Sequence, residues 1–184
     1  MTGLLAAASG RVFVEELLRR ASATVRIMSF RDLRRRVVPP VPEGEIAPCF
    51  STSRLLLKVG GASDWPAAKT FSREIAESGR RGDPFLANLM APEMIRTLLA
   101  RGMRAGDVAV TLPVFCRPSE KISHRLRQFE GYVSVVPFAP PISFVAAAAR
   151  SGLTIGFTYL ESEFDAARAG ALADAVIAQL EAAR

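Results

Sequence analysis

The sequence predicts an α/β fold, a two-layer sandwich in which helices pack on one mixed β-sheet. Helical and strand patterns alternate along the 184 residues without a strict strand–helix–strand rhythm, so we expect both parallel and antiparallel neighbours in the sheet. The clearest helix lies near the end of the chain, where apolar residues recur at i, i+3, i+4 and i+7: Ala169, Leu172, Ala173, Val176, Ile177 and Leu180. The clearest strand precedes it and carries one apolar face, made of Leu153, Ile155, Phe157 and Tyr159.

The start of the chain predicts a helix followed by two strands. Apolar side chains share one helical face over residues 3–20, and apolar residues alternate over residues 23–30. Residues 31–48 are rich in proline and have no period, so we expect a long irregular crossing there. A second strand follows over residues 50–59 and ends at the pair Gly60-Gly61.

Two helices and four strand candidates come next. Residues 63–66 (Ser-Asp-Trp-Pro) are typical of a helix start and predict a helix over residues 65–79. Asp83 opens another helix, which we expect Pro92 to interrupt because proline lacks a backbone N–H and its ring clashes with the preceding turn. Asp165 is a suitable N-cap for the final helix. The strand candidates are residues 107–115, 131–138, 142–149 and 153–160.

Composition describes an ordinary globular protein with an excess of positive charge. The chain has 49% apolar residues and a formal charge of +6, which permits an anionic partner without requiring one. We interpret it as a single domain over residues 1–184, because that length can bury one core. Cys49 and Cys116 form no CxxC pair and are typical of free thiols in a reducing compartment. No apolar run is long enough to span a membrane and the start of the sequence lacks signal-peptide features, so we expect a cytoplasmic protein.

Motifs for metal or nucleophilic chemistry are incomplete. The single histidine, His124, cannot build a zinc site of the usual ligand set, so we expect no metal. A Ser-His-acid triad would also need His124, which lies in the polar, basic segment SEKISHRLRQF, and we interpret it as a surface residue. Glu161, Glu163 and Asp165 precede the final helix, where capping and the helix dipole explain them.

A basic run lies between the first strand and the prolines and consists of Arg31, Asp32, Arg34, Arg35 and Arg36. Arginines can bind phosphates, but no aromatic residues are interleaved with these and no DNA-binding motif surrounds them, so we expect no nucleic-acid partner. Because proline supplies no backbone donor, the turn has to satisfy its carbonyls with side chains, and a nearby carboxylate can hold an arginine fork. We therefore expect Asp32 and Arg34 to stabilise the fold, and Arg35 and Arg36 to be largely solvated.

The order of these segments resembles the condensation-domain and chloramphenicol-acetyltransferase-like superfamily of acyltransferases. The match begins with an alanine-rich helix, a strand, the turn Asp32-Leu33-Arg34, a proline-rich crossing and a strand, and continues with DWPAAKTFSREIAESGRRGDPF. DVAVTLPVF is similar to the strand that carries Ser-Asn-Leu-Gly in many relatives, and GLTIGFTYLESEFDAARAGALADAVIAQL is similar to the closing strand and helix. The resemblance covers nearly the whole sequence but only the second half of that fold. Within the superfamily the sequence most resembles phthiocerol dimycocerosyl transferases and alcohol acyltransferases.

The resemblance implies acyl transfer from a CoA or acyl-carrier-protein thioester to an alcohol or amine, with no cofactor and no metal. The general base of these enzymes is a histidine of an HHxxxDG motif in the first half of the fold, and this sequence has no such motif. Its one histidine follows the DVAVTLP strand and does not correspond to that base, so no catalytic residue is assigned to this chain. The resemblance places Val110, Thr111 and Pro113 along the substrate channel, and Asp32 and Arg34 in a structural turn beside it.

Two functional hypotheses follow. In the first, the chain is the half of a thioester-dependent acyltransferase that lacks the base and needs a partner chain carrying HHxxxDG. In the second, it is a non-catalytic binding or scaffold module derived from the same fold. A lone second half leaves an apolar face bare, so we expect it to bind a first-half chain or to self-associate.

Overall fold

The structure is a computed structural model that describes residues 2–42, 45, 49–61, 63–100, 108–112, 142–149 and 152–183. Its elements, in chain order, are α1 (Thr2–Val12), the π-helix η1 (Phe13–Leu17), β1 (Ser22–Asp32), β2 (Phe50–Gly60), α2 (Trp65–Arg81), α3 (Asp83–Ala100), β3 (Val108–Leu112), β4 (Ile142–Ala149), β5 (Gly152–Tyr159) and α5 (Ala166–Ala182). The strand expected over residues 131–138 lies outside the described residues.

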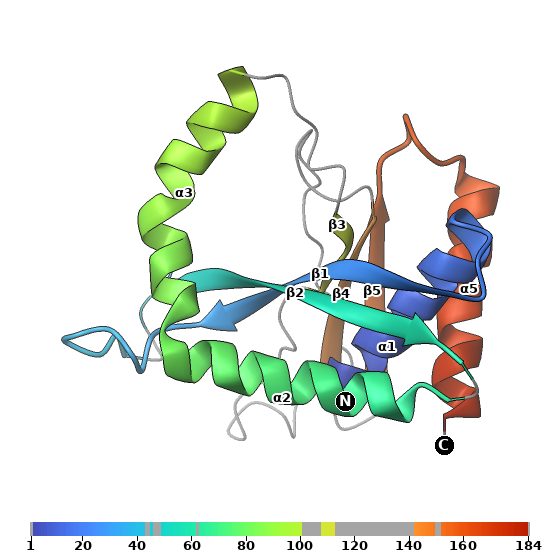
Figure 1. Cartoon of the computed structure of the whole chain (residues 1–184), viewed down its shortest axis with the longest axis horizontal. Helices are drawn as coiled ribbons and strands as arrows, with labels where there is room; N and C mark the ends of the chain where they lie inside the picture. Colours follow the sequence, from blue (N-terminus) through green and yellow to red (C-terminus); the bar gives the residue numbers. More distant parts are fainter. Residues whose placement is uncertain are drawn as a thin grey trace.

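The strands form one mixed sheet in the order β2-β1-β3-β4-β5. β1 pairs antiparallel with β2 and parallel with β3, while β4 pairs parallel with β3 and antiparallel with β5. Figure 1 shows α2 running along the β1–β2 part of the sheet, with α1 and α5 side by side at its other end. This arrangement confirms the two-layer α/β sandwich with a mixed sheet that the sequence predicts.

The hydrophobic core lies between the sheet and the helices α1, α2 and α5. Ladder partners share a face of the sheet, so Val25 and Ile27 of β1 lie beside Leu57 and Leu55 of β2 on the side of the helices. Even-numbered residues of β1 and β2 lie on the opposite side, which we call the second face. The core cluster includes side chains from both layers: Leu5, Val12, Val25, Ile27, Leu57, Phe71, Phe144, Leu172 and Val176.

The predicted N-cap of the final helix is confirmed. The Asp165 carboxylate accepts the backbone N–H of Arg168 at 2.7 Å, which satisfies one of the donors that a helix start leaves without an intrahelical partner. At the start of α2, by contrast, the Asp64 side chain makes no capping bond. Its carboxylate pairs instead with Arg11 of α1 at 2.6 Å.

The expected interruption at Pro92 is wrong, because α3 continues through this proline from Asp83 to Ala100. Proline removes the backbone hydrogen bond to the carbonyl four residues earlier, which belongs to Asn88. Both Asn88 and Pro92 are exposed. Solvent can therefore reach this turn, and the turns on either side hold the helix together.

Candidate functional site

The basic run begins in β1 and continues as a hydrogen-bonded turn. The Asp32 carboxylate accepts the backbone N–H of Arg34 at 2.9 Å, and the N–H of Leu33 donates to the carbonyl of Cys49 at 2.8 Å. The Leu33 side chain is buried. Asp32 thus caps the turn, and its contribution to stability, like that of Arg34, stays a prediction.

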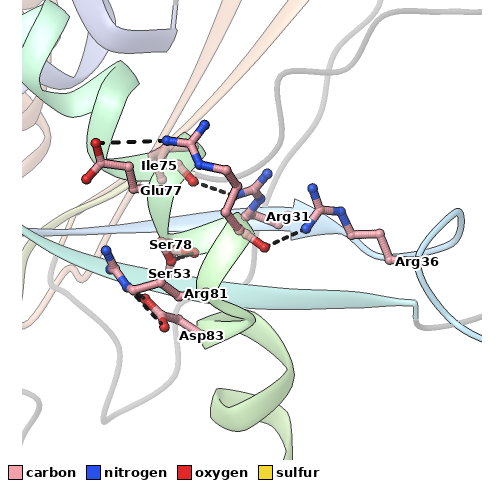
Figure 2. Close-up of polar contacts among 10 residues, drawn as sticks. Arg31, Arg36, Ser53, Ile75, Glu77, Ser78, Arg81 and Asp83 are labelled. Carbon is pink, nitrogen blue, oxygen red and sulfur yellow. Dashed lines mark hydrogen bonds and ion pairs between the residues drawn. The ribbon is translucent and has the colours of Figure 1, made fainter.

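Two guanidinium groups of the run reach the last turns of α2 (Figure 2). Arg31 donates from Nη1 to the carbonyl of Ile75, and Arg36 donates from Nη1 to the carbonyl of Gly79 at 2.7 Å. Because α2 ends at Arg81, the carbonyl of Gly79 is one of the last four, which lack intrahelical partners. Positive charge is also favourable at this end of a helix. Arg36 is exposed, which agrees with the expectation that it is largely solvated, and the helix end also offers its guanidinium an acceptor.

Arg31 lies directly against Gly79. A Cβ atom at Gly79 would come within 2.8 Å of both Cζ and Nη2 of Arg31, so glycine leaves the space that the guanidinium occupies. Partial burial, and to a lesser extent the nearby charge of Arg36, lowers the pKa of Arg31. The group still carries its charge at neutral pH. Arg31 and Arg36 together hold the end of β1 and the start of the proline-rich crossing against α2.

Acidic side chains accompany the cations at this end of α2 (Figure 2). Arg81 and Asp83 form an exposed pair at 2.7 Å, in which the hydrogen bond from Arg81 lowers the pKa of Asp83. Glu77 pairs with Arg80 at 3.9 Å. These carboxylates pair with the arginines of α2, while Arg31 and Arg36 of the basic run contact backbone carbonyls of the same helix, which supports a structural role for those two residues.

The register of β3 places its two expected channel residues on different faces. Val110 pairs with Ile27, which belongs to the helix-covered face, whereas Thr111 pairs with Met28 and Ser143 on the second face. Pro113 lies outside the described residues, as do His124 and Cys116. The structure therefore brings Thr111 to the second face and does not bring Val110 there with it.

Thr111 belongs to a line of ladder partners that crosses the whole sheet on the second face. We call these five residues the cross-sheet row: Thr158 of β5, Ser143 of β4, Thr111 of β3, Met28 of β1 and Arg54 of β2. Three neighbouring positions carry hydroxyl residues, the fourth a thioether and the last a cation. The row therefore changes from neutral and polar to positively charged along its length.

The two ends of the cross-sheet row differ in exposure. Arg54 lies on the edge strand, is exposed and forms no ion pair with any described residue, whereas Ser143 is only 2% exposed. β4 is buried on both faces, because Ile142 and Phe144 lie in the core and Ser143 and Val145 are buried on the second face. The sequence reasoning missed Ser143. The signal in the sequence was a lone hydroxyl residue within the apolar segment ISFVAAAA. Strands that are buried on both faces normally carry apolar residues at every position.

The part of the chain that the structure describes has neither a metal-binding cluster nor a membrane-spanning helix. Among these residues, no three His, Cys, Asp or Glu side chains gather closely enough to hold a metal ion. None of the described helices combines the length and the apolar character needed to cross a bilayer.

The sequence matches no protein-family model and no curated protein, but solved structures share its fold. The structure of polyketide synthase associated protein 5 from Mycobacterium tuberculosis superposes with a TM-score of 0.62 at 15% identity, over 97% of this chain and 44% of that chain. The epimerization domain from the third module of tyrocidine synthetase B gives 0.58 at 18% identity, over 100% and 41%. The first condensation domain of the CDA synthetase gives 0.56 at 15% identity, over 99% and 39%.

These similarities establish the fold, which the chain shares with condensation and epimerization domains and with polyketide synthase associated protein 5, as the order of its segments predicts. The chain spans less than half the length of each of these solved chains. Because one fold can host unrelated reactions, what the chain does depends on the surfaces it presents.

Proposed function

We propose that the chain is one lobe of a thioester-dependent acyltransferase, which moves an acyl group from CoA or an acyl-carrier protein to an alcohol or amine. The observation that carries the proposal is the extent of the fold match, which takes in nearly all of this chain but less than half of each solved protein. The rest of such a fold has to come from another segment or another chain. That other part of the fold would also supply the histidine that acts as the general base.

The reaction divides between this lobe and the part that carries HHxxxDG. In the transfer, a histidine removes the proton from the acceptor oxygen or nitrogen, the acceptor bonds to the thioester carbonyl carbon, and the C–S bond breaks to release a thiol. The base must lie within hydrogen-bond reach of that proton. This lobe contributes the second face, with Thr111 and Met28, as a wall of the channel and supplies no acid–base group.

Exposed apolar surface on α3 supports the need for a partner. Leu86, Leu89 and Met90 are 57%, 81% and 58% exposed. One side of α3 is held to β2, where Asn88 donates to the carbonyl of Phe50 at 3.2 Å, and its later turns extend away from the sheet (Figure 1). Helices with apolar residues on several sides are normally buried, and the other lobe is the cover that this proposal assigns to α3.

A non-catalytic binding or scaffold module is the second candidate, and the missing HHxxxDG motif favours it. Such a module would associate with a partner through the same α3 surface. It would add nothing to the rate of acyl transfer, so complementation separates the two candidates.

Acyl transfer should appear only when the lobe is complemented. The isolated chain, assayed with several acyl-CoA donors and with alcohol and amine acceptors, should give background rates because it has no base. Adding a separately produced superfamily first lobe that carries HHxxxDG should raise the rate, and the same lobe with alanine at the basic histidine is the control. Turnover by the isolated chain that survives His124→Ala would contradict the proposal. A complex that forms without turnover would favour the scaffold module.

A further inference from the structure

A pocket of about 240 Å³ lies on the helix side of the sheet, where three helices meet. Its walls come from Arg11 of α1, from residues 63–65 at the start of α2, and from the last turn of α5. Figure 1 shows the end of α5 close to the start of α2. The proposed function does not use this pocket, because the channel wall belongs to the second face.

Asp64 brings a buried carboxylate to the pocket. Its side chain is only 6% exposed, and Oδ1 accepts a hydrogen bond from Nε of Arg11 at 2.6 Å. Oδ2 has no hydrogen-bond partner among the described residues, since the side chain does not cap α2. A carboxylate can accept about four hydrogen bonds, and buried polar atoms are nearly always paired. The unused oxygen therefore points to a ligand that donates a hydrogen bond.

The charges around the pocket favour a cation as that donor. The guanidinium of Arg11 lies against two carboxylates, Asp64 at 2.6 Å and Glu15 at 3.7 Å, so the three groups together carry one negative charge. Gln179 and Ala182 line the pocket and belong to the last four residues of α5. Carbonyls at this end of a helix lack intrahelical partners and carry the negative end of the helix dipole.

The start of α2, which would ordinarily attract an anion, has lost its first donors. The N–H of Trp65 donates to Oγ of Ser63 at 3.2 Å, and the next residue, Pro66, has no N–H. The side chain of Trp65 lines the pocket and is 49% exposed. Among aromatic side chains, the indole ring attracts a cation most strongly. Both features of α2 therefore agree with a positively charged ligand.

We propose that this pocket binds a primary ammonium group carried on a short apolar stem. The ammonium group donates to Oδ2 of Asp64 and to carbonyls at the end of α5, and the stem packs against the indole of Trp65 and the methyl group of Ala182. This site goes beyond the proposed function. Its ligand binds on the helix side of the sheet and takes no part in acyl transfer.

The fluorescence of Trp65, the single tryptophan of the chain, reports on this pocket directly. The probes are butylammonium and its uncharged counterpart butanol, each titrated into the full chain at constant ionic strength. Butylammonium should change the emission saturably, and butanol should not. Asp64→Asn keeps the shape of the side chain but removes its charge. It should weaken butylammonium binding by about tenfold or more, the effect of one hydrogen bond between charged groups.

A second pair of variants tests the pocket without altering the Arg11–Asp64 pair. Ala182→Leu puts a larger side chain into the pocket and should abolish the response. Ala178→Leu, one turn earlier at an exposed position of α5, should leave it unchanged, and this comparison decides the matter even where Asp64→Asn does not fold. The site would be overturned by no saturable response to butylammonium, by an equal response to butanol, or by full affinity in Ala182→Leu or in folded Asp64→Asn. None of these outcomes bears on acyl transfer by the complemented lobe.

Discussion

Gly79→Ala is the substitution whose effect most directly tests the contact between the basic run and α2. In an ordinary helix interior, replacing glycine with alanine stabilises the protein by about 1 kcal/mol, because glycine loses more backbone freedom on folding. At Gly79 the new Cβ would overlap the space of the Arg31 guanidinium, within 2.8 Å of Cζ and Nη2. The guanidinium has to move, and its hydrogen bond to the carbonyl of Ile75 is lost.

The size of the effect follows from these two opposing terms. A hydrogen bond from a charged donor contributes about 1.5–3 kcal/mol, which exceeds the gain in helix propensity of about 1 kcal/mol. We therefore expect Gly79→Ala to lower the free energy of unfolding by about 0.5–2 kcal/mol. With Arg31→Met already in place, the clash is absent and Gly79→Ala should stabilise the protein by up to about 1 kcal/mol.

Urea denaturation of the wild type, both single variants and the double variant measures this change of sign. Gly170→Ala in α5 is the matched control, because a Cβ there would meet nothing within 4 Å, and it should stabilise the protein by about 1 kcal/mol. If Gly79→Ala stabilised the wild type as much as Gly170→Ala does, the guanidinium would not occupy this position and the reasoning would be refuted.

Two further predictions concern charged side chains. Asp64→Ala should lower the free energy of unfolding by about 1.5–3 kcal/mol, because Arg11 loses its 2.6 Å partner but keeps the carbonyl of Gly61 at 2.9 Å and Glu15 at 3.7 Å. Glu93→Ala breaks an exposed pair with Arg96 and should change the free energy of unfolding by only about 0–1 kcal/mol. Similar losses of stability in Asp64→Ala and Glu93→Ala would contradict a stabilising role for the Arg11–Asp64 pair. Asp32→Ala and Arg36→Ala should each lower the free energy of unfolding by roughly 1 kcal/mol, through the lost bonds to Arg34 N–H and to the Gly79 carbonyl, whereas Lys58→Ala should not. Unchanged stability of Arg36→Ala, together with a salt-sensitive loss of nucleic-acid binding, would point to a nucleic-acid surface instead.

Local patterns in the sequence were sufficient for most elements. The apolar stripe and the Asp165 cap predicted α5, and the alternation before it predicted β5, because both signals depend on residues close together in the chain. The family-like order of segments then indicated the fold, which the solved structures confirm. Pro92 shows where local reasoning stops, since a proline is tolerated in α3 only because the surrounding turn is exposed.

Contacts between distant segments could not be predicted in this way. Arg31 and Ile75 are 44 residues apart, and Arg36 and Gly79 are 43 apart, so no periodicity links them. The cross-sheet row also depends on contacts between segments that are distant in the sequence. It exists because the parallel pairing of β3 with β1 and β4 puts Thr111 beside both Met28 and Ser143, and neither pairing follows from the strand sequences alone.

The buried hydroxyl groups on the two faces of the sheet differ in whether they form hydrogen bonds that join elements of the fold. Ser51 lies on the helix-covered face and donates to the carbonyl of Pro84, while Ser53 pairs with Ser78 of α2. These bonds join β2 to α2 and α3, so folding accounts for them. Ser143 has the same chemistry and similar burial but lies on the face opposite α1, α2 and α5, where no such bond forms. Substitutions on the helix-covered face should therefore change stability first, whereas those on the second face, which the proposed function makes a wall of the channel, should first change acyl transfer in the complementation assay. A variant that folds like the wild type but fails in complementation would accordingly be expected in the cross-sheet row.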